Sequence, residues 1–234
     1  MPIINIQTEL KKLVNPVQAQ NLSRFFKTGP GQYGEGDKFL GLKVPQIRVV
    51  AKKFVHLDFV DLQNLLNSPY HEFRLAALLV LVQKYNLADK SEQKRIFNFY
   101  LKNSKNVNNW DLVDLSADRI MGPYLEDKER SLLYKLVKSN NLWERRIAVL
   151  TTFWFIKNND FADSLRLARI LLDDQHDLIH KAVGWMLREI GKRNVALLEV
   201  FLKKYYQVMP RTMLRYAIER FPEKIRQRYL KGLI

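Results

Sequence analysis

Apolar residues recur along the chain at helical spacing, and no section is rich in strand-forming residues. Ile6, Leu10 and Leu13 lie three or four residues apart, and a second short pattern covers residues 17–26. Residues with this spacing share one face of a helix. We therefore predict a helix in each segment, and a third that Pro45 begins and that continues through Phe54.

Glycine interrupts this pattern between residues 28 and 37, a segment that holds four of the nine glycines and predicts a loop. The stretch from Gly29 to Gly34 has the GxGxxG spacing of dinucleotide-binding folds. That fingerprint requires a strand before it and a helix after it. Here a helical pattern precedes it and Pro30 interrupts it, so we reject a dinucleotide site.

Beyond residue 57 the chain repeats a unit of two helices. The first helix of each unit is amphipathic, and the second, as in residues 73–82 and 147–156, is apolar almost all round. Corresponding positions follow each other at intervals of 36, 36, 35 and 31 residues; they are Arg74, Trp110, Arg146, Lys181 and Thr212. A period of this length is typical of stacked helical hairpins.

The repeats predict an all-α fold in which residues 1–234 form one domain. Residues 1–57 would contain the N-terminal helices and the glycine-rich loop, and residues 58–234 about five helical repeats. We expect an α-solenoid whose second helices line a concave groove. Arg74, Arg146 and Lys181 occupy matched positions on these helices, and because large cations are unfavourable to bury unpaired, we expect a basic stripe in open space.

The net charge of +15, with an isoelectric point near 9.9, favours a polyanionic partner. Residues 1–57 and 201–234 each carry nine Lys or Arg, against three and two acidic residues respectively. Two basic ends suit a long anion such as DNA lying across the molecule. A ribosomal partner or an anionic membrane would satisfy the same pattern.

Several classes of function are excluded by residues that are missing or wrongly spaced. The chain has no cysteine, which rules out thiolate catalysis and disulfides and fits a cytoplasmic protein. The N-terminus lacks the order of a secretion signal. His176 and His180 are four residues apart, but Asp177 stands where a zinc hydrolase of this spacing would carry Glu. A third ligand is also needed, and the other two histidines, His56 and His71, lie far away in the sequence, so we expect no metal site.

The segment from Asn108 to Asp114 holds the candidate chemistry. On a helix, Trp110 and Asp114 share one face, where an indole beside a carboxylate could hold a cation. Arg146 follows one repeat later, and the next repeat carries a basic and aromatic set consisting of Lys181, Trp185 and Arg188. The alternative is that both tryptophans are core residues and that the charged side chains are solvated.

The sequence resembles that of a known family, the AlkD-like DNA glycosylases, which are DNA alkylation repair enzymes built of HEAT-like repeats. The resemblance covers nearly the whole chain. It is carried by four stretches: FLGLKVPQIR at 39–48, NWDLVD at 109–114, LWERRIAVL at 142–150 and KAVGWMLRE at 181–189.

The resemblance implies a monofunctional glycosylase for base excision repair. Such an enzyme releases cationic alkylpurines, typically 3-methyladenine and 7-methylguanine, from double-stranded DNA. Asp114 matches the acidic residue that stabilises positive charge on the deoxyribose and helps to position the attacking water. Trp110 and Trp185 match aromatic residues that contact the sugar-phosphate of the lesion. No cofactor is expected, and we expect a monomer.

The same resemblance suggests how DNA is held. Arg146 matches a family arginine near the DNA backbone, and we expect further contacts from four basic residues: Lys43, Arg48, Lys181 and Arg188. Lys43 replaces a neutral amide found in the best-known members, and Trp154 stands where some carry a basic residue. The family leaves the damaged base in the duplex, which fits a shallow groove without a nucleobase pocket.

The chemistry of purine release supports a glycosylase independently of the family resemblance. A cationic alkylated purine needs no general acid to depart, so a single carboxylate that stabilises the oxocarbenium-like sugar suffices. The alternatives are a DNA-binding protein of the same family without excision activity, which the charge alone would explain, and a helical-repeat scaffold that binds peptides.

Overall fold

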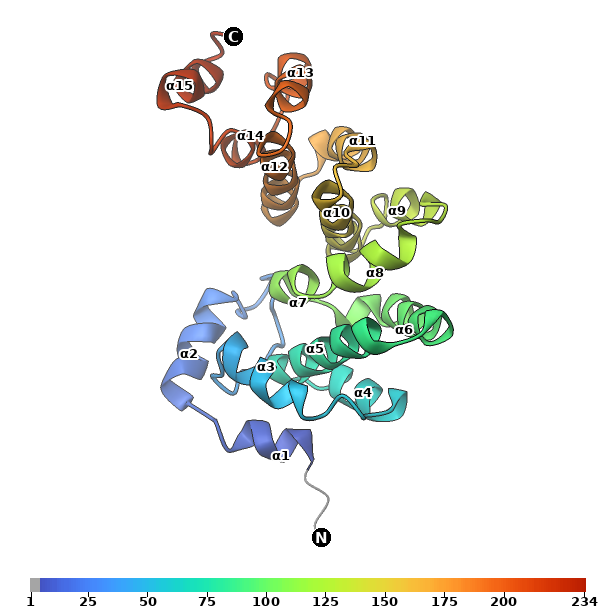
Figure 1. Cartoon of the computed structure of the whole chain (residues 1–234). Coiled ribbons are helices and arrows are strands. Elements are labelled where there is room, and N and C mark those ends of the chain that lie inside the picture. Colours follow the sequence, from blue (N-terminus) through green and yellow to red (C-terminus); the bar gives the residue numbers. More distant parts are fainter. Residues whose placement is uncertain (1–4) are drawn as a thin grey trace. The chain divides into compact units, whose positions relative to one another are not determined.

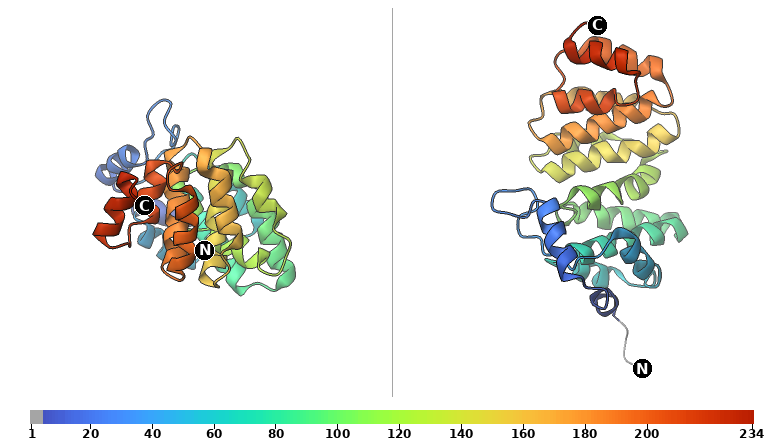
Figure 2. Two further views of the ribbon diagram at one scale, coloured as in Figure 1. Left: turned by 90° about the horizontal axis from the view of Figure 1, so that it is seen from above. Right: turned by 90° about the vertical axis from the view of Figure 1, so that its left-hand side faces the viewer.

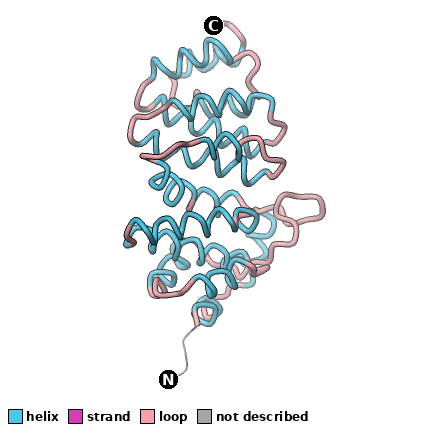
Figure 3. The backbone as a smooth tube through the Cα atoms, turned by 90° about the vertical axis from the view of Figure 1, so that its right-hand side faces the viewer, coloured by secondary structure: helices cyan, strands magenta, loops and turns pink. Residues whose placement is uncertain are grey.

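The computed structural model describes residues 5–234, and all regular structure in that range is helical (Figure 3). A single isolated bridge, between Lys38 and Tyr70, is the nearest approach to a strand in this range. The predicted all-α class is therefore confirmed. The chain divides into two compact units, and the boundary along the sequence falls between Ser116 and Ala117. One domain over the whole chain stays a prediction, and its first four residues lie outside the described range.

From residue 5 onward, the first unit contains seven α-helices and one short 3₁₀ helix (Figure 1). Their bounds are α1 Ile6–Lys11, α2 Pro16–Phe25, α3 Val44–Lys52, α4 Phe59–Leu66, α5 His71–Leu87, α6 Lys90–Lys102, η1 Ser104–Asn106 and α7 Trp110–Asp114. The three predicted N-terminal helices are present as α1, α2 and α3. Asn5 and Asn15 begin the first two, each accepting a hydrogen bond from a backbone N–H of the first turn.

Helix α5 is the centre of the first unit. Helices α3, α4, α6 and α7 pack against it, and every residue from His71 to Val82 is buried. Such a helix has no solvent-facing stripe, which is why its sequence is apolar almost all round. The prediction for residues 73–82 is confirmed, and the polar residues at the start of this helix must find partners inside the protein.

Glu72 finds its partners in the backbone that leads into α3. Its carboxylate accepts hydrogen bonds from the N–H groups of Leu40, Gly41 and Leu42 at 2.8–3.2 Å. Gly41 has φ +88°, and a Cβ atom there would lie 2.0 Å from the carbonyl oxygen of Asn15. The close approach of α2 to this segment therefore requires glycine.

Replacing Gly41 by alanine is expected to lower the free energy of unfolding by more than about 1 kcal/mol, because the methyl group meets backbone as well as an unfavourable φ. Gly31 offers the matched control, since its φ is +72° but a Cβ atom added there would have no other atom within 4 Å. Urea denaturation of both variants measures the difference. Equal losses for Gly41→Ala and Gly31→Ala would show that the contact with Asn15 is unimportant.

The second unit contains eight α-helices and one 3₁₀ helix. Their bounds are α8 Ala117–Leu125, α9 Ser131–Leu136, α10 Leu142–Lys157, α11 Ala162–Ile170, η2 Leu171–Asp173, α12 Asp177–Gly191, α13 Val195–Tyr205, α14 Arg211–Ala217 and α15 Glu223–Lys231. Within this unit α8, α10, α12 and α14 pack in succession, and α9, α11 and α13 pack against them as a second layer (Figure 2). This is the arrangement expected of paired helices that repeat along the chain.

The expected basic stripe is wrong at two of its positions. Arg74 is 4% exposed and forms an ion pair with Asp37, with 2.6 Å between Nη2 and Oδ1. Arg146 is 5% exposed, and its Nη1 donates to the carbonyl oxygen of Leu178. Both guanidinium groups have acceptors inside the protein, so the argument that large cations must face open space does not apply to them.

Candidate active site

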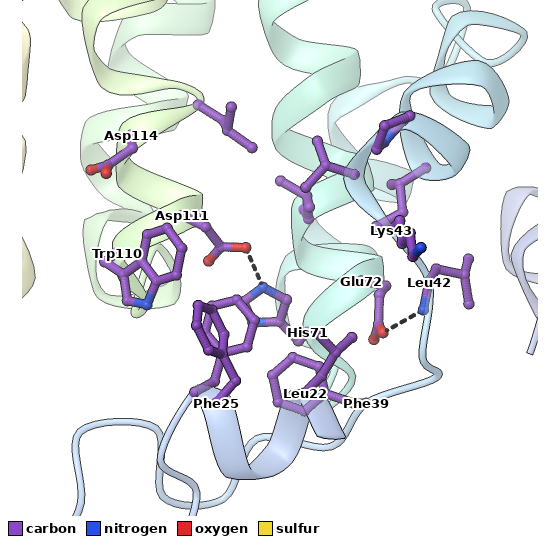
Figure 4. Close-up of a pocket in the computed structure, with 16 residues that line it drawn as sticks. Leu22, Phe25, Phe39, Leu42, Lys43, His71, Glu72, Trp110, Asp111 and Asp114 are labelled. Atoms are coloured by element: carbon purple, nitrogen blue, oxygen red, sulfur yellow. Dashed lines mark hydrogen bonds and ion pairs between the residues drawn. The ribbon is translucent and has the colours of Figure 1, made fainter. Parts of the chain in front are cut away.

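Helix α7 carries the predicted tryptophan and carboxylate. Asn109 begins it by accepting a hydrogen bond from the backbone N–H of Trp110 at 2.8 Å, and Leu112 and Val113 anchor its inner face in the core. Trp110 and Asp114 are half-buried, and both line one cavity (Figure 4). The predicted shared face is therefore present.

This cavity, which we call the aromatic cavity, lies wholly within the first unit and has a volume of about 410 Å³. Helices α2, α3, α5 and α7 and the segment before α3 supply its lining, which is almost entirely apolar. Its members are Leu22, Phe25, Phe26, Phe39, Leu42, Lys43, Val44, Pro45, Ile47, His71, Glu72, Leu75, Trp110, Asp111, Asp114 and Leu115. The expectation of a shallow groove without a nucleobase pocket stays a prediction.

Stacked rings form one side of the aromatic cavity. Phe26 lies between two rings, with 5.2 Å to the centroid of Trp110 at an interplanar angle of 19° and 5.1 Å to that of Phe39 at 17°. Phe39 in turn stacks on the imidazole of His71 at 4.8 Å. Such stacked contacts hold the rings more firmly than apolar burial alone. The ring of Phe26 therefore fixes the position of Trp110.

A buried chain of charged groups fixes the start of α7. His71 bonds Oδ2 of Asp111 through Nε2 at 2.8 Å and Oδ2 of Asp37 through Nδ1 at 3.2 Å. Asp37 also pairs with Arg74 and accepts a bond from the Asn109 side chain at 3.3 Å. The glycine-rich loop, α5 and α7 are therefore joined through one network, which orients the helix that bears Asp114.

The two carboxylates make His71 a cation. Burial by itself lowers the pKa of His71, but the charge and hydrogen bond of Asp111, followed by the hydrogen bond of Asp37, outweigh it and raise the pKa to about 9. For the Asp37 carboxyl, burial acts in the opposite direction and favours a higher pKa. The hydrogen bond from His71 and the charge of Arg74 outweigh burial and hold the pKa of Asp37 below its ordinary value. At neutral pH both imidazole nitrogens therefore donate.

Sequence reasoning missed this network. His71 stood out only as one of two histidines outside the rejected metal pair, and Asp37 was assigned to the loop. A usable signal was present in the order His71, Glu72 and Arg74 at the entrance to an apolar run. When a helix is buried on every side, ionisable residues in its first turn need partners inside the protein.

The ionisable lining of the aromatic cavity is net acidic. It holds the carboxylates of Glu72, Asp111 and Asp114, against the side chains of His71 and Lys43. In a chain with a net charge of +15, such a local excess of negative charge favours a nearby cation. Aromatic faces add to this preference.

The predicted residues on α12 lie in the second unit. Trp185 is half-buried; its Nε1 donates to Glu189 at 3.2 Å and its ring contacts that of Phe153 at 5.5 Å. Lys181 pairs with Asp177 at 2.7 Å, and Arg188 pairs with Glu219. The predicted gathering of these residues with Trp110 and Asp114 of the first unit stays a prediction.

The remaining predicted residues are distributed as follows. Lys43 is exposed at the start of α3 and lines the aromatic cavity, and Arg48 is half-buried on the same helix. Trp143 is 7% exposed and belongs to the core. The side chain of Trp154 packs closely on Gly122, where an added Cβ would lie 2.3 Å from the Cβ atom of Trp154.

His176 and His180 both form hydrogen bonds at the start of α12. His176 begins α12, accepting the N–H of Leu178 at 3.1 Å, and His180 bonds the carbonyl oxygen of Asp174 through Nε2. Over residues 5–234 no group of histidine and acidic side chains is arranged to hold a metal ion. None of the helices in this range is long and apolar enough to cross a membrane.

Comparison with known proteins identifies relatives over most of the chain. Residues 6–221 match the model of a family described as DNA alkylation repair enzyme. A solved structure titled as a predicted DNA alkylation repair enzyme from Enterococcus faecalis is similar, with a TM-score of 0.68 and 17% identity, over 90% of this chain and 97% of the other.

Two structures from Streptococcus mutans are also similar. AlkD2 gives a TM-score of 0.58 at 17% identity, over 88% of this chain and 99% of its own. The protein smu.31 gives 0.55 at 18% identity, over 92% and 100%. No curated protein matches. At these identities the solved structures show a shared fold.

Proposed function

Because the chain belongs to the family of DNA alkylation repair enzymes, we propose that it is a monofunctional DNA glycosylase that excises cationic alkylated purines from duplex DNA. Its substrates would include 3-methyladenine and 7-methylguanine. The observation that carries this proposal is the position of Asp114, which lines the same aromatic cavity as Trp110 and lies four residues from it on α7.

The proposed reaction needs one carboxylate. The N-glycosidic bond breaks and its electron pair passes to the base, which leaves without its positive charge. The deoxyribose becomes oxocarbenium-like, and Asp114 stabilises that charge through space. Water then bonds to the sugar carbon and releases a proton to the solvent, which gives an abasic site and the free base. Since the leaving group is already cationic, no general acid is required.

The proposed mode of DNA binding follows from the helical repeats and the net positive charge. We interpret the helical pairs as HEAT-like repeats of an α-solenoid with a basic concave groove, in which Lys43, Arg48, Lys181 and Arg188 contact the phosphates. Trp185 would contact the sugar-phosphate of the lesion together with Trp110. Arg146 is buried and bonded to Leu178, so its share in DNA binding should be smaller than that of the other four.

We further propose that the protein acts as a monomer in the cytoplasm and without a cofactor. Excision by a single carboxylate requires no metal or redox group. The net charge of +15 gives the electrostatic attraction to the duplex, and binding should therefore weaken steeply as salt is raised.

Incubation with duplex DNA that contains 7-methylguanine tests the function. We expect release of free 7-methylguanine well above the rate in buffer, measured by chromatography of the supernatant, and no release of guanine from undamaged DNA. Tight, salt-sensitive binding without release would instead support the non-catalytic DNA-binding alternative. Weak binding even at low salt would contradict both.

A further inference from the structure

We propose that Glu219 competes with DNA for Arg188: in the free protein its carboxylate pairs with the guanidinium, and a phosphate of the duplex displaces it. Asp177 competes for Lys181 in the same way. This inference rests on the proposed function, in which Arg188 and Lys181 contact the phosphates. It adds two carboxylates that limit how tightly the protein binds a duplex.

Arg188 and Glu219 meet where two helices of the second unit pack together. Arg188 lies on α12 and Glu219 in the turn that follows α14, and these two helices lie side by side (Figure 1). Nη1 of Arg188 donates to Oε2 of Glu219. The interval between the two residues, 31 positions, equals that between Lys181 and Thr212. They therefore occupy corresponding positions in successive repeats, and such positions share one face.

The ion pair between these residues is open to exchange. The side chain of Glu219 is 46% exposed and that of Arg188 is 18% exposed, so the carboxylate returns to water when it leaves. Within the described chain Arg188 donates one hydrogen bond, through Nη1, and its Nε has no acceptor. Arginine commonly binds phosphate through two parallel bonds. Exchange of the carboxylate for a phosphate therefore replaces one bond by two.

Lys181, the other residue of α12 that is expected to contact phosphate, is paired in the same way. Its Nζ lies 2.7 Å from Oδ2 of Asp177, four residues earlier on the same helix. The side chains of Lys181 and Asp177 are 40% and 55% exposed, so this carboxylate can also be displaced into water. Both expected phosphate contacts of α12 therefore have an exposed carboxylate as a partner in the free protein.

The two carboxylates lower the affinity for DNA of any sequence. Phosphate contacts supply binding free energy without distinguishing one base from another, and a chain with a net charge of +15 has many cations that can form them. Each displaced carboxylate takes back part of the free energy that its cation gains from the phosphate, because the ion pair is lost. Weaker binding to undamaged duplex shortens each encounter and so favours movement along the DNA in search of a lesion.

Glu219→Gln tests this inference through binding alone. The amide keeps the size of the side chain but loses the charge that competes with phosphate. Fluorescence anisotropy measures the Kd for an undamaged duplex at about 50 and 200 mM salt. We expect the Kd of the variant to be lower than that of wild type by at least about threefold. Glu92→Gln is the matched control, because Glu92 forms a 2.7 Å ion pair with Arg95, which is not an expected DNA contact. It should change the Kd much less.

A double-mutant cycle separates competition for Arg188 from a general effect of charge. In an Arg188→Gln background, Glu219→Gln should no longer tighten binding, because no guanidinium is left for the carboxylate to occupy. An equal gain in both backgrounds, or a gain no larger than that of Glu92→Gln, would overturn the inference. Should Glu219→Gln fail to fold, Asp177→Asn with and without Lys181→Gln gives the same cycle.

The outcomes separate this inference from the proposed function. Release of 7-methylguanine from DNA by wild-type protein, combined with an unchanged Kd in a folded Glu219→Gln variant, overturns the competition and leaves the glycosylase intact. Tighter binding of Glu219→Gln that requires Arg188, without any release of base by wild-type protein, overturns the glycosylase. That second result still supports competition between Glu219 and phosphate in a DNA-binding protein without excision activity.

Discussion

Asp114→Asn is expected to slow the release of 7-methylguanine from duplex DNA by about 100-fold or more, which corresponds to about 2.7 kcal/mol of lost transition-state stabilisation. The side chain keeps its shape but loses the charge that opposes the developing positive charge on the sugar. Binding of the duplex should be unchanged or slightly tighter, because one negative charge is removed from a protein that binds a polyanion.

A single-turnover assay with enzyme in excess over 7-methylguanine-containing DNA measures this effect free of product release. Asp127→Asn is the matched control, because it makes the same change of charge at an exposed residue outside the aromatic cavity. It should retain the wild-type rate. An Asp114→Asn variant that is folded and excises at the wild-type rate would remove Asp114 from the chemistry.

Raising the pH from about 6.5 to above 9 is expected to weaken the folded state through His71. The pKa of this imidazole is raised from 6.5 to about 9 in the folded protein. A raised pKa contributes stability that is fully present below the unfolded value and disappears as the pH rises through the folded value. A difference of this size corresponds to on the order of 3 kcal/mol.

Urea denaturation at several pH values between 6 and 10 tests this prediction. The His71→Gln variant cannot gain a proton, so its free energy of unfolding should change much less across this range. It should also be less stable than wild type at pH 6.5, since Asp111 would be left buried without its charged partner. His56→Gln, at an exposed histidine, should behave as wild type. A wild-type protein with constant stability over this range would refute the role of His71.

Much of the fold could be predicted from spacing alone. The apolar run of residues 73–82 lies in a helix that is buried throughout that run, and the glycine-rich segment before α3 contains no helix. Both results follow from local physics, namely helical periodicity and the backbone freedom of glycine. The family followed from motifs spread over the chain, and the match to residues 6–221 confirms it.

The buried charges could not be predicted, because each depends on a partner that is distant in the sequence. Arg74 was expected in open space, but its carboxylate partner is Asp37, 37 residues earlier. His71 is likewise joined to Asp111, 40 residues later. Helical phase places a residue on a face but does not reveal what covers that face. The aromatic cavity was missed for the same reason, since α2, α3 and α7 meet only in the folded unit.

The burial of α5 has a consequence for how this protein can diverge. Between His71 and Val82 there is no exposed position at which a substitution would meet only water, so single changes there leave a void or a clash. Solved relatives keep the fold at 17–18% identity. Neutral drift in this helix should therefore proceed by paired, volume-conserving exchanges with α3, α4, α6 and α7, and not by independent single steps.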